Sequence, residues 1–210
     1  MSAAPRSSPL ALTVLALLHY KPLHPYGVQR LLKEWGKDQV VNVGQRAGLY
    51  RTMGRLLEAG LITVRETGRD ALYPERTVYE LTGLGSATAH RWLDEMLAGP
   101  KQEYPEFPAA LSLVMLLTPE AAADALGRRA AALEAALAAH EGDLARSAEL
   151  GLPRVVLLES EYLRAVTAAE LGWVREVLAD QAAGRLDWSP EELLALAGAT
   201  DDSEEEVRGG

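Results

Sequence analysis

The sequence contains no cysteine, a single phenylalanine and few isoleucines. Without cysteine the chain can form no disulfide, no thiolate zinc site and no cysteine nucleophile, which fits a reducing compartment. The apolar residues, 48% of the chain, are mostly leucine and alanine, and these favour helices over sheets. Such an apolar share is enough for a folded core, and 210 residues are enough for one large domain or two small ones.

The sequence also lacks a long apolar run. The longest one near the start spans residues 10–18, which is too short to cross a bilayer. It follows prolines and serines with only Arg6 as a charge, and this is a poor match to a secretory signal. We therefore expect a cytoplasmic protein with no membrane partner.

Motifs of catalysis and of metal binding are missing as well. There is no glycine-rich phosphate loop, no GxSxG nucleophile elbow and no HExxH pair. The four histidines have no carboxylate or second histidine at ligand spacing in the sequence. We expect no enzymatic activity, no catalytic residue, no metal site and no cofactor.

Positive and negative charges are distributed unevenly along the chain, whose formal net charge is −9. Residues 1–100 carry 12 Lys and Arg against 9 Asp and Glu, a balance of +3. Residues 101–210 carry 9 against 21, a balance of −12. This asymmetry is typical of a nucleic-acid-binding half joined to a half with another role.

Residues 42–67 combine an amphipathic helix with a strand. Leu49 and Met53 belong to an apolar face at helical spacing, and a rotation of about 100° per residue puts Arg51 on the opposite face. Gly60 ends the helix because glycine adopts the left-handed C-terminal conformation cheaply, and a β-branched run follows at once. Such a helix suits the major groove of DNA, although an ordinary helix with a solvated basic face would have the same pattern.

The flanking segments complete a winged helix-turn-helix motif. Ser8 and Pro9 begin a first helix as cap and first residue, and two alternating strands after the central helix flank a connection rich in turn residues. In this motif the second helix enters the major groove and the wing reaches the neighbouring backbone. The expected helices span residues 9–20, 28–35, 45–59 and 83–97, and the expected strands span 62–66 and 76–81.

Three motifs stand out in this half: HPYGVQRLL at 24–32, GLYRTMGRLLEAGLI at 48–62 and ERTVYELTGLG at 75–85. Together they resemble the PadR-type transcriptional regulators, the phenolic-acid-response repressors. The resemblance implies a homodimeric winged-helix repressor with a helical dimerisation domain, and some relatives hold flat hydrophobic effectors with aromatic residues. The chain departs from the family pattern at Ala47-Gly48, where relatives have Gly followed by Ser or Thr, and at Arg51, where they often have proline.

The arginines of the central helix and of the wing are the main DNA-binding candidates. Arg51 comes first, because arginine can bond bidentately to guanine, as glutamine can to adenine. Tyr50 has packing in the motif core as its alternative, and the wing arginines have solvated charges as theirs, in place of phosphate contacts. The expected DNA-binding residues are Gln45, Arg46, Tyr50, Arg51, Arg55, Arg65 and Arg69.

The second half is expected to be helical. Thr118 and Pro119 begin a long helix as cap and first residue, and its seam positions follow the 4-3 spacing of a coiled coil from residue 126 to 144. A Gly-Leu-Pro sequence ends this helix, and the acidic end of the chain is expected to be disordered. The expected helices span residues 110–118, 119–150, 154–183 and 186–198, after a kinked linker at 103–108.

Two long antiparallel helices bury one face on each other and keep apolar positions that need another partner, so we expect a homodimer. His140 is expected at the interface. Trp92 and Trp173 are candidates for an effector site between subunits, with core packing as the alternative for both. The expected dimerisation residues are Leu126, Leu133, Leu137, Val155, Leu158, Tyr162, Val166 and Trp173.

These features predict a mainly α-helical protein with a small β-hairpin. A winged helix-turn-helix domain at 9–99 precedes a helical dimerisation domain at 100–198, with a flexible start at 1–8 and a disordered end at 199–210. The expected function is dimeric, sequence-specific binding to a palindromic double-stranded DNA operator, as a repressor that a small aromatic effector relieves. The alternatives are a winged helix used as a protein-interaction module, and a dimer that captures effectors without binding an operator.

Overall fold

The structure, a computed structural model, describes residues 7–37, 40–41, 46–70 and 73–189, apart from the side chains of 46, 67–70 and 73–76. The chain consists of two compact units that divide after Glu103, close to the predicted boundary. No helix in the described ranges is long and apolar enough to cross a membrane. The first unit contains α1 (Pro9–Tyr20), α2 (Pro25–Glu34), α3 (Arg46–Glu58), β1 (Ile62–Asp70), β2 (Tyr73–Leu81) and α4 (Gly83–Ala98).

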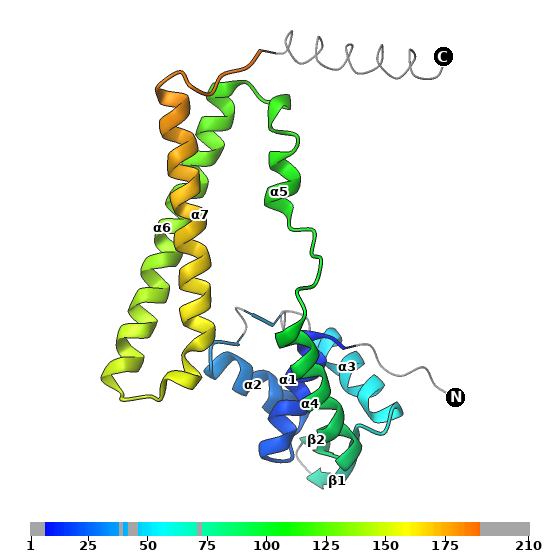
Figure 1. Cartoon of the computed structure of the whole chain (residues 1–210). Helices are drawn as coiled ribbons and strands as arrows, with labels where there is room; N and C mark the ends of the chain where they lie inside the picture. The colour runs from blue at the N-terminus through cyan, green and yellow to red at the C-terminus, as the bar shows by residue number, and fades with distance from the viewer. Residues whose placement is uncertain (1–6, 38–39, 42–45, 71–72, 190–210) are drawn as a thin grey trace, which may run out of the picture. The chain divides into compact units, whose positions relative to one another are not determined.

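One apolar cluster holds the first unit together, with α1 at its centre (Figure 1). Val14 and Leu15 of α1 are fully buried, and α3 adds Met53 and Leu56. Burying a leucine or methionine side chain contributes about 1.5–3 kcal/mol. This burial therefore determines which face of α3 is left exposed.

The second helix begins earlier than predicted, at Pro25 instead of residue 28. His24 caps it, since its Nδ1 accepts a hydrogen bond of 3.1 Å from the Tyr26 amide. Proline is favoured at the first helical position, where its missing N–H has no partner to lose. The turn predicted at 24–27 is thus the first turn of the helix.

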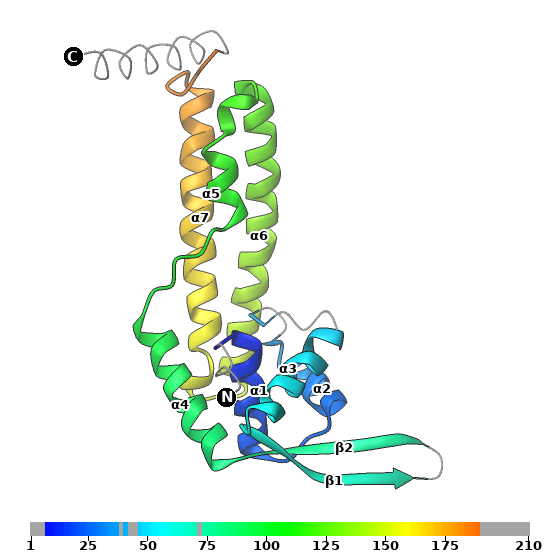
Figure 2. The same cartoon turned by 90° about the vertical axis from the view of Figure 1, so that its right-hand side faces the viewer.

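The wing is longer than predicted and projects from the first unit as a two-stranded hairpin (Figure 2). Its strands pair antiparallel as far as Asp70 opposite Tyr73, so most of the loop expected at 67–75 is strand. Polar and glycine residues mark a loop in the sequence, but a hairpin has two exposed edges and tolerates them. Leu23 joins the hairpin through two backbone hydrogen bonds to Tyr79, of 2.9 and 3.0 Å.

A tight corner joins α3, the wing and α4. Gly60 ends α3 with a φ of 69°, as predicted. The Thr82 hydroxyl accepts a hydrogen bond of 3.0 Å from the Gly85 amide, and it lies 2.7 Å from the Gly60 carbonyl oxygen and 3.0 Å from that of Leu61. This corner fixes the wing relative to α3, the two elements from which the predicted DNA contacts come.

The second unit is built on two long antiparallel helices (Figure 2). Their contact buries Leu126 and Ala130 of α6 against Leu171 and Val174 of α7. The predicted 4-3 seam is confirmed here as a contact within one chain. The unit contains α5 (Glu106–Leu111), the 3-10 turn η2 (Val114–Leu116), α6 (Pro119–Glu149), the 3-10 turn η3 (Arg154–Val156) and α7 (Leu158–Ala182).

The prediction of one helix at 110–118 is wrong, because α5 ends at Leu111 and the 3-10 turn η2 follows it. The two prolines of residues 103–108 led to the prediction of a kinked linker there. Pro108 instead lies in the first turn of α5, where a missing N–H costs nothing. Of the last helix predicted at 186–198, residues 186–189 are not helical. The rest of it, the end at 199–210 and most of the start at 1–8 lie outside the described residues.

Candidate nucleic-acid interface

The exposed face of α3 carries the two arginines on which the DNA-binding prediction depends. Leu49 and Met53 are buried, whereas Arg51 and Arg55 are exposed on the other side of the helix. The helical rotation predicted for Arg51 is therefore confirmed.

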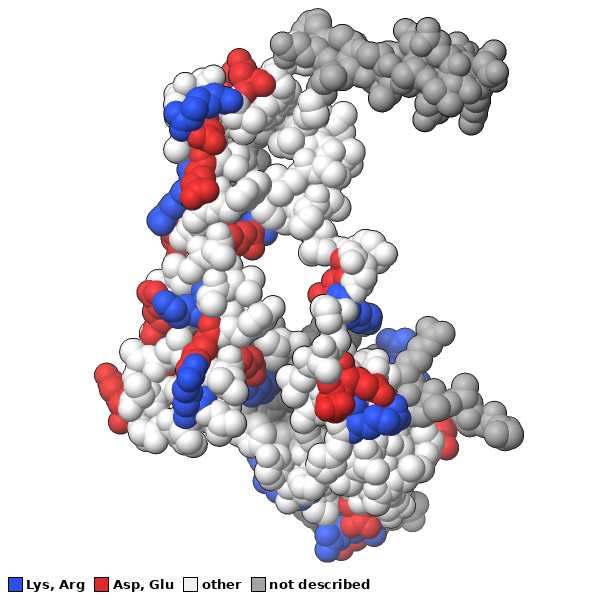
Figure 3. Space-filling model, viewed as in Figure 1, with Lys and Arg blue, Asp and Glu red and all other residues white. Residues whose placement is uncertain are grey.

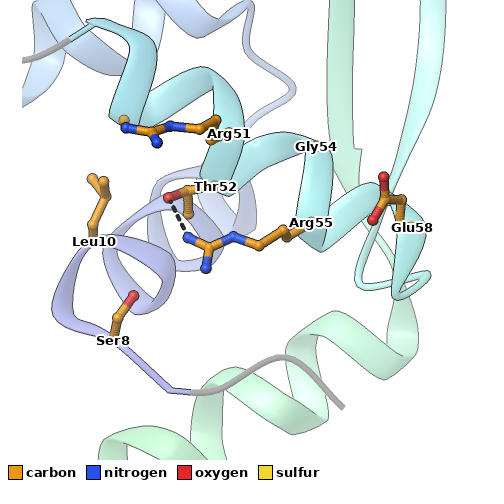
Figure 4. Close-up of a pocket in the computed structure, with 8 residues that line it drawn as sticks. Ser8, Leu10, Arg51, Thr52, Gly54, Arg55 and Glu58 are labelled. Atoms are coloured by element: carbon orange, nitrogen blue, oxygen red, sulfur yellow. Dashed lines mark hydrogen bonds between the residues drawn. The ribbon is translucent and has the colours of Figure 1, made fainter. Parts of the chain in front are cut away.

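A hollow of about 640 Å³ lies on this face of α3. Figure 4 shows that both arginines border it from α3, and that Ser8 and Leu10 border it from the start of α1. Glu58, one helical turn beyond Arg55, is the acidic residue of the lining. The hollow is thus bordered by two cationic side chains and one anionic side chain.

The two guanidinium groups are held in different ways. Arg55 donates a hydrogen bond of 3.2 Å to the Thr52 hydroxyl, and Thr52 is only 4% exposed. Arg51 donates from Nε to the Ala47 carbonyl oxygen of its own helix, at 3.3 Å. A guanidinium has five N–H donors, so both arginines keep donors that can bind a phosphate or the edge of a base.

The other predicted DNA-binding residues have varied surroundings. Tyr50 is 52% exposed, so its ring packs only in part against the unit. Arg65 lies on the wing and forms an exposed ion pair of 3.9 Å with Glu80 of the opposite strand. Gln45 lies outside the described residues, and so do the side chains of Arg46 and Arg69.

The predicted dimerisation residues fall into two groups. Leu126 is buried between α6 and α7 of the same chain, and Leu133 and Leu137 pack against that cluster. The side chain of Leu126 is thus used in a contact within one chain, and its expected role in dimerisation stays a prediction. The exposed group, on η3 and α7, consists of Val155, Leu158, Tyr162, Val166 and Trp173.

The two tryptophans considered for an effector have opposite environments. Trp92 is 2% exposed in the core of the first unit, and this burial favours core packing over the effector site. Trp173 is 43% exposed and borders a cavity of the second unit. His140, expected at an interface, is half-buried on α6.

Two structural features were not predicted from the sequence. The fold brings His19 of α1 and His90 of α4 together, with ring centroids 6.2 Å apart, although 70 residues separate them. Thr52 supports Arg55 from a buried position three residues away in the helix, and the i to i+3 spacing is the signal that could have found it. Within the described ranges no group of three or more His, Asp or Glu could hold a metal ion.

Compared by sequence, the chain matches no protein-family model and no curated protein. Compared by structure, it is similar to Bacillus subtilis PadR in complex with operator DNA, with a TM-score of 0.66 and 22% identity over 83% of this chain and 99% of that one. The chain has the fold of the PadR-type transcriptional regulators. The resemblance drawn from the three motifs and the predicted fold class are thus confirmed at the level of the fold.

Two further solved structures widen this comparison. Bacillus subtilis PadR in complex with p-coumaric acid gives a TM-score of 0.66 and 20% identity over 82% of this chain and 98% of that one. The Vibrio cholerae virulence activator AphA gives a TM-score of 0.61 and 20% identity over 83% of this chain and 98% of that one. The fold thus occurs in an operator-bound protein, in a protein bound to a phenolic acid and in an activator.

Proposed function

We propose that the protein is a dimeric, sequence-specific DNA-binding transcriptional repressor without catalytic activity. The observation that carries this proposal is the outward face of α3, which exposes Arg51 and Arg55 next to the wing. The same fold in PadR bound to operator DNA supports the assignment.

In the proposed complex α3 enters the major groove and the wing follows the neighbouring backbone. Arg51 reads a base, because its guanidinium is held only by the backbone of its own helix and can reach guanine bidentately. Arg65 contacts a phosphate from the wing, exchanging its weak, exposed ion pair with Glu80 for the DNA backbone. Arg46 and Tyr50 of α3 help Arg51, and Arg69 of the wing is a further phosphate contact. Gln45, which lies outside the described residues, stays a predicted helper.

Two copies of the chain read a palindromic operator, and the second unit joins them. What supports a dimer is the exposed apolar row along α7, in which Leu158, Tyr162, Val166 and Trp173 are 43–68% exposed. Spacing of 4, 4 and 7 residues keeps these side chains on one helical face. An exposed apolar row of this length is typical of an interface, and a second copy of the chain is the simplest partner.

Relief by a small hydrophobic effector is the regulatory part of the proposal. What supports it is the p-coumaric acid complex of PadR, a protein with the same fold. A small rotation of the two winged-helix units about the dimer would change the spacing of the two α3 helices and weaken operator binding. AphA, with this fold, is an activator, so the sign of regulation is measured separately, by transcription from the bound promoter.

A mobility-shift titration on the DNA upstream of the protein's own gene tests the function, at 50 and 200 mM salt. We expect a specific complex that weakens steeply with salt. Arg51→Ala should abolish the specific complex and leave the dimer intact, whereas Arg91→Ala, an exposed arginine of α4 paired with Glu95, should bind as the unchanged protein does. A dimer that shifts no promoter DNA at either salt would refute operator binding and favour a protein-interaction role.

A further inference from the structure

A cavity of about 530 Å³ lies at the end of the second unit where α6 begins and α7 ends. This volume is within the range of about 300–1,000 Å³ that ligand pockets occupy. The lining comes from α5, η2, α6, α7 and the segment after α7, and all of it lies within the second unit. Met115 and Leu186, which do not belong to the α7 row proposed for the dimer, are 39% and 38% exposed, so solvent reaches the cavity.

The walls of the cavity are apolar and include two indole rings. Trp188 is fixed, because its Nε1 donates a hydrogen bond of 2.9 Å to the Leu117 carbonyl oxygen. The ring of Trp173 is steadied by an edge contact to Phe107, with centroids 6.1 Å apart. Two oriented aromatic rings favour a flat aromatic ligand, which can stack on one ring and meet the edge of the other.

The polar lining of the cavity has one sign of charge. Gln181 is neutral and donates to the Pro119 carbonyl oxygen, while Asp187 is the charged residue of the lining and accepts a hydrogen bond from the Trp188 amide. Among the described residues, no lysine or arginine belongs to the lining. The nearby Arg185 donates two hydrogen bonds to the Asp180 carboxylate, and this carboxylate balances the positive charge of Arg185.

The side of the cavity formed by α5 and η2 is uncharged. Residues 107–119 contain no Lys, Arg, Asp or Glu, and Figure 3 shows the surface over the end of α5 and over η2 without charged side chains. A ligand carboxylate would therefore meet the negative charge of Asp187 with no cation to pair with. An amine or hydroxyl of the ligand would instead donate a hydrogen bond to Asp187.

We propose that this cavity binds a flat bicyclic aromatic molecule that is uncharged or cationic, and that it discriminates against aromatic carboxylates. The ligand of this site would belong to a different chemical class from p-coumaric acid, the carboxylic acid bound in the PadR complex. Only the regulatory meaning of the site, as that of an effector, rests on the proposed function. Ligand binding itself requires no DNA.

Isothermal titration calorimetry of the full chain with three probes of one shape tests the site. The probes are 2-naphthalenemethanol, 2-naphthylmethylamine and 2-naphthoate, which are neutral, cationic and anionic. We expect the first two to bind and the naphthoate to bind about tenfold more weakly, because one like charge in a partly exposed site has an effect of this size. Asp187→Asn should raise the affinity for the naphthoate to nearly that for the alcohol. Asp124 is an exposed aspartate outside the lining, and Asp124→Asn should leave all three affinities unchanged.

A filling variant checks the position of the site. Met115→Trp should weaken the binding of all three probes at least about tenfold, because the added indole occupies the space that the ligand needs. Met96→Trp is the matched control, because Met96 is 37% exposed against 39% for Met115 and lies on α4 of the first unit. Absence of binding up to millimolar probe, equal affinity for the three probes, or equal behaviour of the two tryptophan variants would each overturn the inference.

The outcomes separate this inference from the proposed function. If the naphthalenes bind and the promoter DNA does not, the ligand site stands and the operator role falls. If the DNA binds and the naphthalenes do not, the ligand site falls and the operator role stands.

Discussion

The Arg55 guanidinium is held by the hydroxyl of Thr52, a residue that is only 4% exposed and lies on the same helix (Figure 4). This hydrogen bond keeps the guanidinium close to α3 and beside the start of α1, instead of letting it extend outward. A side chain held in this way suits a fixed phosphate of the DNA backbone, whereas Arg51 is held by the backbone of its own helix, through the Ala47 carbonyl oxygen. Under the proposed function, we therefore expect Arg55 to contribute to affinity and Arg51 to sequence discrimination.

Thr52→Val removes the hydroxyl and keeps the shape of the side chain. Loss of one hydrogen bond to a charged group should weaken binding by about 1–2 kcal/mol, or roughly fivefold to thirtyfold, and equally for operator and random DNA. Thr13→Val is the control, because Thr13 also donates within its own helix, at 2.8 Å to the Pro9 carbonyl oxygen, but lies on α1. Fluorescence anisotropy with both DNAs measures the effect, and a change in the ratio of the two affinities would contradict a phosphate role for Arg55.

Gly85 is the position at which the first unit should tolerate a side chain least. A Cβ there would lie 1.9 Å from the Leu61 carbonyl oxygen. Alanine gains about 1 kcal/mol of helix propensity over glycine, but relieving this backbone clash costs more, so Gly85→Ala should lower the free energy of unfolding by about 3 kcal/mol.

Gly83→Ala provides the comparison for Gly85→Ala, since a Cβ at Gly83 meets nothing within 4 Å. It should leave stability unchanged or slightly raised. Urea titration of both variants measures the difference, and equal midpoints would show that α4 can move away from the α3–β1 corner at little cost.

Much of the first unit could be predicted because its signals are local. Pro9 with its Ser8 cap, Gly60 and Thr82 each begin or end an element through bonds to residues a few positions away. The length of the wing could not, because the strand that contains Gly68 is stabilised by the opposite strand, which sequence periodicity does not reveal. The bridge between Leu23 and Tyr79 was missed for the same reason.

In the second unit the sequence predicted helices but not all of their contacts. A 4-3 seam has the same pattern whether it meets a helix of the same chain or of another, so the sequence could not show that Leu126 packs against α7 of its own chain. Trp92 is apolar and helical, as an effector-binding residue would be, and only the fold shows that it is buried. The cavity next to Trp173 was also beyond prediction, because its lining joins α5 to a segment that follows α7.

The apolar row of α7 gives a direct prediction for the dimer. Tyr162 is 68% exposed within the row. In the proposed dimer Tyr162→Glu would bury an unpaired charge, which costs much free energy. We expect a monomer at micromolar concentration and loss of operator binding.

Tyr20→Glu, at the end of α1, is the control for the dimer prediction because Tyr20 is also highly exposed, at 78%, but belongs to the first unit. Analytical ultracentrifugation of both variants separates the outcomes. If Tyr162→Glu sediments as the unchanged protein does, the interface lies elsewhere on the chain.

Phe107 attaches α5 to the long helices, and Arg129 is the residue whose removal should release it. The Arg129 guanidinium lies 3.5 Å from the centroid of the Phe107 ring and also bonds to the Glu170 carboxylate of α7. Arg129→Lys keeps the charge but loses the flat stacking surface, and Arg129→Met loses both the charge and the ion pair. Hydrogen exchange of the amides of residues 106–111 should therefore quicken in both variants, and more in Arg129→Met. Arg128→Met, an exposed neighbour on α6, should exchange as the unchanged chain does. Equal exchange in all four proteins would mean that the contact of Arg129 with Phe107 does not hold α5 in place.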